Sequence, residues 1–492
     1  MADVLRLWWS HLLLFFLMRS LLAGLLSLCL PFCANATLLG PPANPNVGGR
    51  WAGTLRLPSG NNLTLIVNIK DNNTGRRTAT LDVPTQNAQG VLMDRVDVRA
   101  DSVLLSSSQI KASFAGRLTG DGRQIDGRWQ QNGAKLPLVF QRASSTTTAG
   151  PKRPQEPAAP FPYREEQVRF ASKDPGVQLA GTLTMPEGAG PFPAVVLLSG
   201  SGAQDRDESI FGHHPFRVVA DYLTRRGIAV LRFDDRGVGQ SGGNAATATA
   251  ADYAKDAQGA LSFLRSRPSL NAKQLGLVGH SEGGTAAIAA AGQAQGPAFL
   301  VLLATPGVPG IDVLSRQAMD LARLKTQDPK VLASTEQRQR NMLMIVQQTQ
   351  DNVRAQQQII KVLTPSVALP PDMAEQIHKA AEAQATMATS PAFRHILADN
   401  PQKTLAAVKC PVLALNGSRD LQVASSVNLP AIEKTLKSTG NRDVTTQELP
   451  GLNHMFQTSA TGAPTEYGQI EETFSPVALQ SISDWLTQHT KR

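Results

Sequence analysis

From about residue 160 to the C-terminus, short apolar runs alternate with longer stretches in which apolar residues recur at helical spacing. A continuous apolar run is typical of a strand buried on both faces, as in a parallel sheet. Helical spacing predicts amphipathic helices between such strands. Strands are expected at Pro193–Leu198, Leu275–Val278, Phe299–Ala304, Pro411–Gly417 and Asp443–Leu449, and helices at Phe216–Arg226, Ala251–Arg267 and Pro476–Gln488. This alternation predicts a doubly wound α/β sheet.

One stretch, from about Val308 to Pro401, interrupts the alternation because it lacks buried strands and is rich in Ala, Gln, Met and Leu. It predicts a helical insertion at about 308–401, between the sixth and seventh strands of the sheet. Met342, Leu343 and Val346 recur at helical spacing and form a mostly apolar face together with Ile345. That face either packs on the core or lines a pocket for an acyl chain.

Residues 46–142 follow a different pattern, in which short alternating stretches are separated by turn residues such as Gly120-Asp121-Gly122. Strands are expected at Trp51–Leu57, Leu63–Ile69, Thr78–Val83, Arg95–Arg99, Ser102–Ser106, Gln109–Phe114 and Gln124–Trp129. The pattern predicts a small all-β barrel or sandwich that precedes the α/β domain. It contains no plausible catalytic group, so we expect a binding or packing module. Residues 143–162 are rich in Ser, Thr, Pro and Ala and predict a linker, which places the catalytic domain at 163–492.

The first residues predict a signal peptide over 1–36. Arg6 and Arg19 flank apolar stretches, Leu21–Leu30 is a suitable apolar segment, and Ala34-Asn35-Ala36 matches a small-residue cleavage site. We therefore expect a secreted or periplasmic protein with no stable membrane insertion after cleavage. The alternative is an uncleaved anchor, because Leu12–Leu30 approaches the length of a membrane span.

Cysteine content and charge narrow the possibilities further. Cleavage after Ala36 removes Cys29 and Cys33 and leaves only Cys410, so no internal disulfide is expected. Cys410 begins a predicted strand and is expected to be a small buried residue rather than a nucleophile. The net charge of +9 is diluted over 492 residues, and no basic run with interleaved aromatic residues is present. Nucleic-acid binding is therefore not expected.

The stretch with the clearest chemistry is Gly279-His280-Ser281-Glu282-Gly283, between the expected strand Leu275–Val278 and a helix of small residues. A Gly-x-Ser-x-Gly pentapeptide on a strand-to-helix turn is a nucleophile elbow, which presents the serine hydroxyl at the tip of a sharp turn. Ser281 is therefore the expected nucleophile, and it needs a base to take its proton.

Chain order selects the base and the acid, because in this architecture the order is Ser, then Asp or Glu, then His. Of the eight histidines, only His454 follows Ser281 in a loop after a late strand. Asp420 follows the strand Pro411–Gly417 and is the expected acid, at the strand end where catalytic loops of open sheets lie. Asp312 is the alternative acid.

Two further motifs extend the match beyond the pentapeptide. Ser199-Gly200-Ser201-Gly202-Ala203-Gln204-Asp205-Arg206-Asp207 follows the expected third strand, and Phe233-Asp234-Asp235-Arg236-Gly237 lies after the fourth. With these motifs the chain from about Pro160 resembles an α/β-hydrolase, and specifically bacterial carboxylesterases that carry Ser-Gly-Ser-Gly-x-x-Asp-Arg-Asp after the third strand. The resemblance implies that the insertion at 308–401 is a cap. It also implies an oxyanion hole formed by the backbone N–H groups of Glu282 and Ser201, with Gly202 as the alternative to Ser201. The Asp-Arg-Asp run either shapes the site entrance or forms a surface salt-bridge cluster.

The expected activity is hydrolysis of a small-molecule carboxylic ester by a serine esterase, through an acyl-enzyme intermediate, without a metal or an organic cofactor. A serine peptidase of the oligopeptidase type and an acyl thioesterase would use the same triad. An alternative of another class is a surface binding protein whose hydrolase domain is inactive. That alternative requires a broken triad, whereas all three residue types are present.

Overall fold

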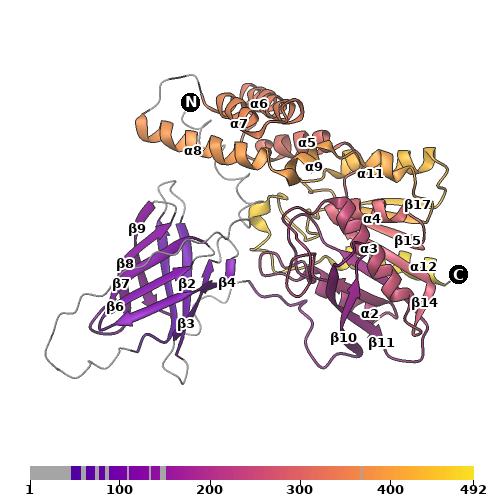
Figure 1. The fold of residues 1–492 in the computed structure, drawn as a ribbon, viewed down its shortest axis with the longest axis horizontal. Coiled ribbons are helices and arrows are strands. Elements are labelled where there is room, and N and C mark those ends of the chain that lie inside the picture. The colour runs from indigo at the N-terminus through magenta and orange to yellow at the C-terminus, as the bar shows by residue number, and fades with distance from the viewer. Residues whose placement is uncertain are drawn as a thin grey trace. The chain divides into compact units, whose positions relative to one another are not determined.

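The computed structural model describes residues 46–56, 62–71, 77–83, 88–107, 110–131, 134–143, 151–365, 367 and 370–491. The predicted signal peptide at 1–36 lies outside these residues. The described chain divides into two compact units (Figure 1). The smaller one comprises the described residues up to Lys152 together with Ile210–His213, and the larger one comprises Arg153–Ser209 and the chain from His214 onward. No helix in the described part of the chain has the length and apolar character needed to cross a membrane.

The N-terminal unit is a single antiparallel sheet in which almost every strand pairs with its neighbours in sequence. Its strands are β1 (Gly49–Arg56), β2 (Asn62–Asp71), β3 (Arg77–Val83), β4 (Ala88–Met93), β5 (Arg95–Arg99), β6 (Ser102–Ser107), β7 (Ala112–Leu118), β8 (Gln124–Gln131) and β9 (Ala134–Arg142). The order is β4-β3-β2-β1-β9-β8-β7-β6-β5. The two end strands, β4 and β5, are separated by Asp94 alone, and β3 lies against β5 and β4 against β6. The sheet therefore curls back on itself as a barrel.

The interior of this barrel is filled by large side chains, as strand alternation requires. Trp51, Phe114, Phe140 and Leu81 are fully buried in one apolar cluster. The predicted all-β unit is thus confirmed, but β4 and β9 were missed. Strand β9 contains Pro137, which interrupts the strand pattern in the sequence.

The larger unit contains one mostly parallel sheet of eight strands. They are β10 (Tyr163–Ala171), β11 (Gln178–Pro186), β12 (Phe192–Leu198), β13 (Ala229–Phe233), β14 (Leu270–His280), β15 (Phe299–Leu303), β16 (Val412–Gly417) and β17 (Val444–Leu449). The order is β10-β11-β13-β12-β14-β15-β16-β17, parallel from β13 to β17. The antiparallel edge of β10 and β11 was not expected from the sequence.

Helices cover both faces of this sheet. They are α2 (Pro215–Thr224), α3 (Ala250–Arg265), α4 (Glu282–Ala291), α11 (Ser425–Ser438) and α12 (Pro476–Thr490). Apolar side chains of α3, α4 and α11 share one core with the sheet, and those of α2 and α12 share the core on its other face. The doubly wound architecture is confirmed. All the parallel strands end at one edge, where the loops of a catalytic site meet.

In the described residues, the insertion between β15 and β16, the sixth and seventh strands, is built of helices. It consists of α5 (Gly310–Arg323), α6 (Pro329–Gln348), α7 (Asn352–Leu363), α8 (Pro371–Ala388), α9 (Pro391–Ala398) and α10 (Pro401–Leu405). Met342, Leu343 and Val346 are buried in a separate cluster with Phe393 and Leu397. The apolar face of α6 therefore packs within the cap, so packing rather than an acyl pocket explains its spacing.

The second half of the predicted linker is part of the larger unit. The Arg153 guanidinium donates hydrogen bonds to the carbonyls of Ile470 (2.8 Å) and Gly468 (2.9 Å). The Gln155 amide donates to the Phe474 carbonyl at 2.7 Å and accepts from the Thr473 N–H at 2.6 Å. This unit therefore begins at Arg153 rather than at residue 163. Composition identified a polar connector but could not show that its side chains find backbone partners far away in the sequence.

Candidate active site

The predicted nucleophile lies on a strained turn between β14 and α4. Ser281 has φ 53° and ψ −119°, a conformation that L-residues rarely adopt and that is held here by its surroundings. Its N–H donates to the Leu303 carbonyl of β15 at 2.8 Å. The half-buried serine thus occupies the tip of a nucleophile elbow at the carboxyl edge of the sheet.

The glycines on either side of Ser281 are required by close packing. A Cβ atom on Gly279 would lie 2.4 Å from the Gly283 carbonyl oxygen. A Cβ atom on Gly283 would lie 2.2 Å from the Leu198 carbonyl oxygen of β12. Both distances are far below van der Waals contact, so glycine at 279 allows the turn to close on itself and glycine at 283 allows it to sit against β12.

The predicted base and acid are in contact with each other. Nδ1 of His454 lies 2.8 Å from Oδ2 of Asp420, and the two side chains are 5% and 0% exposed. The other oxygen of Asp420 accepts the N–H groups of Gln422 at 2.8 Å and Val423 at 2.9 Å. These donors fix the carboxylate, which in turn orients the imidazole. The alternative acid, Asp312, is exposed in the first turn of α5 and does not occupy this place.

The elbow contacts the loop after β17 that carries His454, called the histidine loop from here on, through His280, the residue before the nucleophile. Nε2 of His280 lies 3.0 Å from the His454 carbonyl oxygen. The described residues contain no hydrogen bond between Ser281 Oγ and His454 Nε2, a link that in many hydrolases tightens only when substrate binds. The structure therefore brings the three predicted residues to one edge of the sheet, with the acid–base contact already formed.

The loop after β12 runs beside the nucleophile. A Cβ atom on Gly200 would lie 3.4 Å from Cβ of Ser281. The Gly200 N–H is already used, because it donates to Glu208 Oε1 at 2.7 Å. Ser201 is the next N–H along this loop, and Glu282 supplies the first N–H of α4, where helix backbone donors point outward. Both predicted oxyanion donors therefore belong to segments that flank Ser281.

A family model described as serine aminopeptidase, S33, matches residues 215–458, which span the elbow and both predicted partners. Together with the sheet order, this match decides the class of the larger unit. The C-terminal unit has the α/β-hydrolase fold.

A curated relative, the esterase EstD of Thermotoga maritima, is 35% identical to this chain over 158 residues. The alignment covers 32% of this chain and 37% of EstD, so it spans well under half of the relative. Among solved structures, an esterase of Pyrococcus furiosus is 16% identical, with 70% of this chain and 99% of that chain covered and a TM-score of 0.40. Est1E of Butyrivibrio proteoclasticus, solved with ferulic acid bound, is 15% identical, with 66% and 100% covered and a TM-score of 0.38. Both scores are low, and the fold rests instead on the sheet order.

The Asp-Arg-Asp run of the hydrolase forms salt bridges beneath the loop. Arg206 binds Asp234 through two hydrogen bonds of 3.0 Å (Nε to Oδ1) and 2.7 Å (Nη2 to Oδ2). Asp207 pairs with Arg232 of β13, whose side chain is 5% exposed. Of the two interpretations from sequence, the salt-bridge cluster is the one observed, although the cluster is largely buried. It fastens the loop after β12 to the end of β13.

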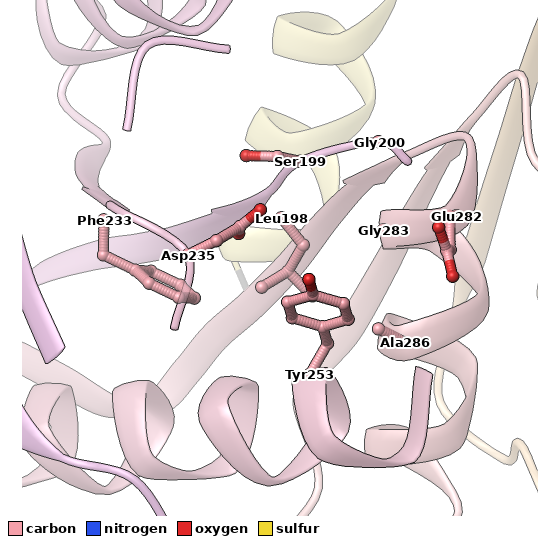
Figure 2. A pocket seen from close by; sticks show the side chains of 9 residues that line it. All are labelled: Leu198, Ser199, Gly200, Phe233, Asp235, Tyr253, Glu282, Gly283 and Ala286. Atoms are coloured by element: carbon pink, nitrogen blue, oxygen red, sulfur yellow. The ribbon is translucent and has the colours of Figure 1, made fainter. Parts of the chain in front are cut away.

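A small cavity of about 10 Å³ lies behind this loop, which is room for about one water molecule. Asp235, Tyr253 and Glu282 contribute polar side chains to it, and Figure 2 shows them grouped around Leu198 and Ala286. Burial raises the pKa of Asp235 well above its usual range, against the opposing effect of its hydrogen bond from the Gln204 N–H (2.9 Å). In its present shape this cavity is too small for an acyl chain.

Sequence reasoning missed a second buried acid–histidine pair beside the first. Nδ1 of His280 lies 2.7 Å from Oε1 of Glu208, and both side chains are almost fully buried. Chain order excludes His280 as the base because it lies inside the elbow, and Glu208 directly follows the Asp-Arg-Asp run. The only signal available in the sequence was that both residues adjoin motifs already singled out.

Cys410 is half-buried rather than fully buried, and it carries no disulfide. Burial raises the pKa of its thiol to about 11, so the sulfur stays protonated at neutral pH. A neutral thiol is a weak nucleophile, which fits the expectation that Cys410 is not a catalytic residue.

Proposed function

We propose that this chain is a serine esterase that hydrolyses carboxylic esters through an acyl-enzyme. Ser281 Oγ attacks the ester carbonyl carbon while Nε2 of His454 takes the hydroxyl proton. The carbonyl π electrons move to oxygen, and the N–H groups of Ser201 and Glu282 stabilise this oxyanion. When the tetrahedral intermediate collapses, the bond to the leaving oxygen breaks and His454 returns the proton to the departing alcohol.

The second half repeats the chemistry with water. His454 takes a proton from a water molecule, whose oxygen attacks the acyl carbon. Collapse of this intermediate breaks the bond to Ser281 Oγ, and His454 returns the proton to the serine. The products are a carboxylic acid, an alcohol and the free enzyme. Asp420 stays ionised throughout and stabilises the imidazolium form of His454.

The observation that carries this proposal is the buried contact between His454 Nδ1 and Asp420 Oδ2, 2.8 Å, in the loops beside the strained elbow. A carboxylate at Nδ1 leaves Nε2 as the proton acceptor, which is the tautomer that a base for Ser281 requires. The curated relative named as an esterase supports an oxygen-ester substrate.

The test is turnover of p-nitrophenyl esters of graded acyl length, with Ser281→Ala as the matched control. The proposal expects saturable hydrolysis of at least one ester, and loss of more than 99% of the rate in the variant, because removing a triad nucleophile costs several orders of magnitude. A folded Ser281→Ala protein that retains more than about 1% of the wild-type rate of ester hydrolysis would contradict the assignment of Ser281 as the nucleophile.

A second candidate activity is peptide hydrolysis, which the description of the matching family model favours. The same triad cleaves amides, so the discrimination rests on substrate rather than on residues. Amino-acid p-nitroanilides and thioesters in the same assay separate a peptidase and a thioesterase from an esterase. If none of the three classes is turned over, the remaining alternative is an inactive binding protein.

We also propose that the enzyme is secreted or periplasmic, on the strength of Ala34-Asn35-Ala36 after the apolar segment Leu21–Leu30. N-terminal sequencing of the protein from the native compartment tests this. A mature chain beginning at Thr37 is expected, whereas an intact N-terminus in the membrane fraction would indicate the anchor.

A further inference from the structure

His280, the residue before the nucleophile, has a hydrogen-bond acceptor at each ring nitrogen. Nε2 faces the His454 carbonyl oxygen at 3.0 Å, and Nδ1 faces Oε1 of Glu208 at 2.7 Å. A carbonyl oxygen can only accept, so Nε2 carries a proton. Oε1 of Glu208 already accepts the Gly200 N–H, and where it also accepts from Nδ1 the ring carries two protons and is an imidazolium.

Glu208 uses the same oxygen twice. Oε1 accepts from His280 and also from the Gly200 N–H at 2.7 Å. Glu208 itself has φ 52°, a conformation that is costly for a non-glycine residue and that aims its side chain inward. One carboxylate oxygen thus joins the loop after β12 to the elbow, and the His280 ring joins the elbow to the histidine loop.

We propose that Glu208 and His280 are positioning residues. They form a charged pair that holds the backbone of His454 and the loop after β12, called the oxyanion loop from here on, at fixed places around Ser281. The proposal rests on the esterase function above and adds to the triad two residues that contact neither substrate nor the reacting atoms. Their effect passes through the His454 carbonyl and the Gly200 N–H, whose displacement by about 1 Å is enough to cost roughly 100-fold in rate.

The charge state of the pair depends on the groups around it. Asp420 and His454 face the His280 ring from the histidine side, and Asp235 faces Glu208 from the end of β13. Burial lowers the pKa of His280, but the charge and hydrogen bond of Glu208 outweigh it, with smaller contributions from the His454 carbonyl and Asp420. The net pKa of His280 is raised, which favours the imidazolium form.

Glutamine cannot replace Glu208 without a loss. Oε1 of a glutamine can accept from both the Gly200 N–H and His280 Nδ1–H, but the positive charge on His280 is then no longer balanced by its partner. If His280 becomes neutral instead, its bare Nδ1 faces the same oxygen and the contact breaks. Glu208→Gln therefore lowers the pKa of His280, and the positioning is lost as pH rises through that new value.

The experiment measures kcat, KM and Tm across pH for a p-nitrophenyl ester with Glu208→Gln, His280→Gln and the double variant. Each single variant is expected to lose roughly 10- to 100-fold in kcat with KM nearly unchanged, since positioning acts on the transition state. The double variant is expected to lose no more than the worse single variant. In Glu208→Gln, kcat falls at a lower pH on the alkaline side than in the wild type.

His378 and Glu382 provide a matched control, because their Nε2 and Oε1 atoms lie 3.4 Å apart on the exposed surface of α8. The variants His378→Gln and Glu382→Gln are expected to leave kcat unchanged at every pH. A uniform loss across pH in Glu208→Gln that tracks a fall in Tm would overturn the positioning role. So would additive losses in the double variant.

Histidine-labelled nitrogen-15 NMR of the wild type separates this proposal from the esterase function. The expected spectrum contains one imidazolium at pH 8 with both nitrogens protonated, and its signals disappear in His280→Gln. A neutral His280 at pH 8 would refute the charged pair even if the esterase is active. If no ester is turned over at all, the positioning role falls together with the esterase function, while the spectrum still decides the state of the pair.

Discussion

The site contains two buried histidine–carboxylate pairs of nearly equal length that face different second partners. Nδ1 of His454 contacts Asp420 at 2.8 Å, and Nδ1 of His280 contacts Glu208 at 2.7 Å. In the described chain Nε2 of His454 has no hydrogen-bond partner, whereas Nε2 of His280 lies on a carbonyl oxygen 3.0 Å away. Residue type and burial alone therefore do not distinguish a catalytic base from a positioning residue.

The difference lies in what each ring can still exchange. An imidazole with one nitrogen on a carboxylate and the other open can take and return a proton. An imidazole with acceptors at both nitrogens keeps its protons and links two segments of the chain through hydrogen bonds. We assign the first role to His454 and the second to His280.

The largest expected effect separates these roles directly. Replacing His454 with alanine removes the base and is expected to lower kcat/KM by roughly 10⁴-fold or more. His280→Gln is expected to cost about 100-fold at most. Steady-state kinetics on one p-nitrophenyl ester gives both numbers. Equal losses in the two variants would remove the distinction between base and support.

Asp420→Asn is expected to come next, with a loss of about 10³- to 10⁴-fold in kcat. Asparagine retains an oxygen for the N–H groups of Gln422 and Val423, so the amide nitrogen faces His454. That nitrogen donates to Nδ1 and moves the ring proton to Nε2, which can then no longer accept from Ser281. A loss below tenfold, in a protein with unchanged Tm, would argue for another acid.

A smaller, structural effect is expected at the salt bridge beneath the oxyanion loop. Burial raises the pKa of Asp234, but hydrogen bonds from Arg206 outweigh it and the net pKa is lowered. The ionised Asp234 carboxylate contributes its full stabilisation of the fold at pH values above its pKa in the unfolded chain, about 4. This contribution is lost as the pH falls through the lower pKa that Asp234 has in the folded protein. Asp234→Asn is expected to cost about 3 kcal/mol in the free energy of unfolding at pH 7.

Urea denaturation of the wild type and Asp234→Asn at pH 7 and pH 3 measures this. The difference in free energy of unfolding between the wild type and Asp234→Asn should be smaller at pH 3 than at pH 7. An equal difference in free energy of unfolding at both pH values would show that the charge of the Asp234 carboxylate does not contribute to stability.

The smallest effect is expected from removal of the N-terminal barrel. Every residue assigned to catalysis follows Arg153, so a chain that begins there should hydrolyse a small soluble ester with kcat/KM within about twofold of the full chain. A start at Phe161 would instead delete the bonds from Arg153 and Gln155. A truncated protein that is folded by circular dichroism yet inactive would show that the barrel contributes to the site.

Local patterns in the sequence predicted the parts of the fold that depend on local causes. The apolar runs of β12, β14, β15 and β16 identified a parallel core, and the glycines around Ser281 identified the elbow. The order of Ser281, Asp420 and His454 then followed from the position of these residues after successive strands. Each of these inferences uses a few neighbouring residues and a strand end.

Contacts between distant segments escaped the same reasoning. Glu208 and His280 are 72 positions apart and meet only because the loop after β12 crosses the elbow. Chain order selects His454, and it excludes His280 because that residue lies inside the elbow rather than after the nucleophile. Strands β4, β9, β10 and β11 were also missed, and in β9 Pro137 interrupts the strand pattern.

The measurement closest to the central claim is covalent labelling by a fluorophosphonate probe, mapped by mass spectrometry. The account predicts one labelled residue, Ser281, with labelling abolished in Ser281→Ala and reduced to background in His454→Ala. His280→Gln should still be labelled, at a slower rate. A label on another residue, or undiminished labelling of Ser281 without His454, would contradict the assignment of nucleophile and base.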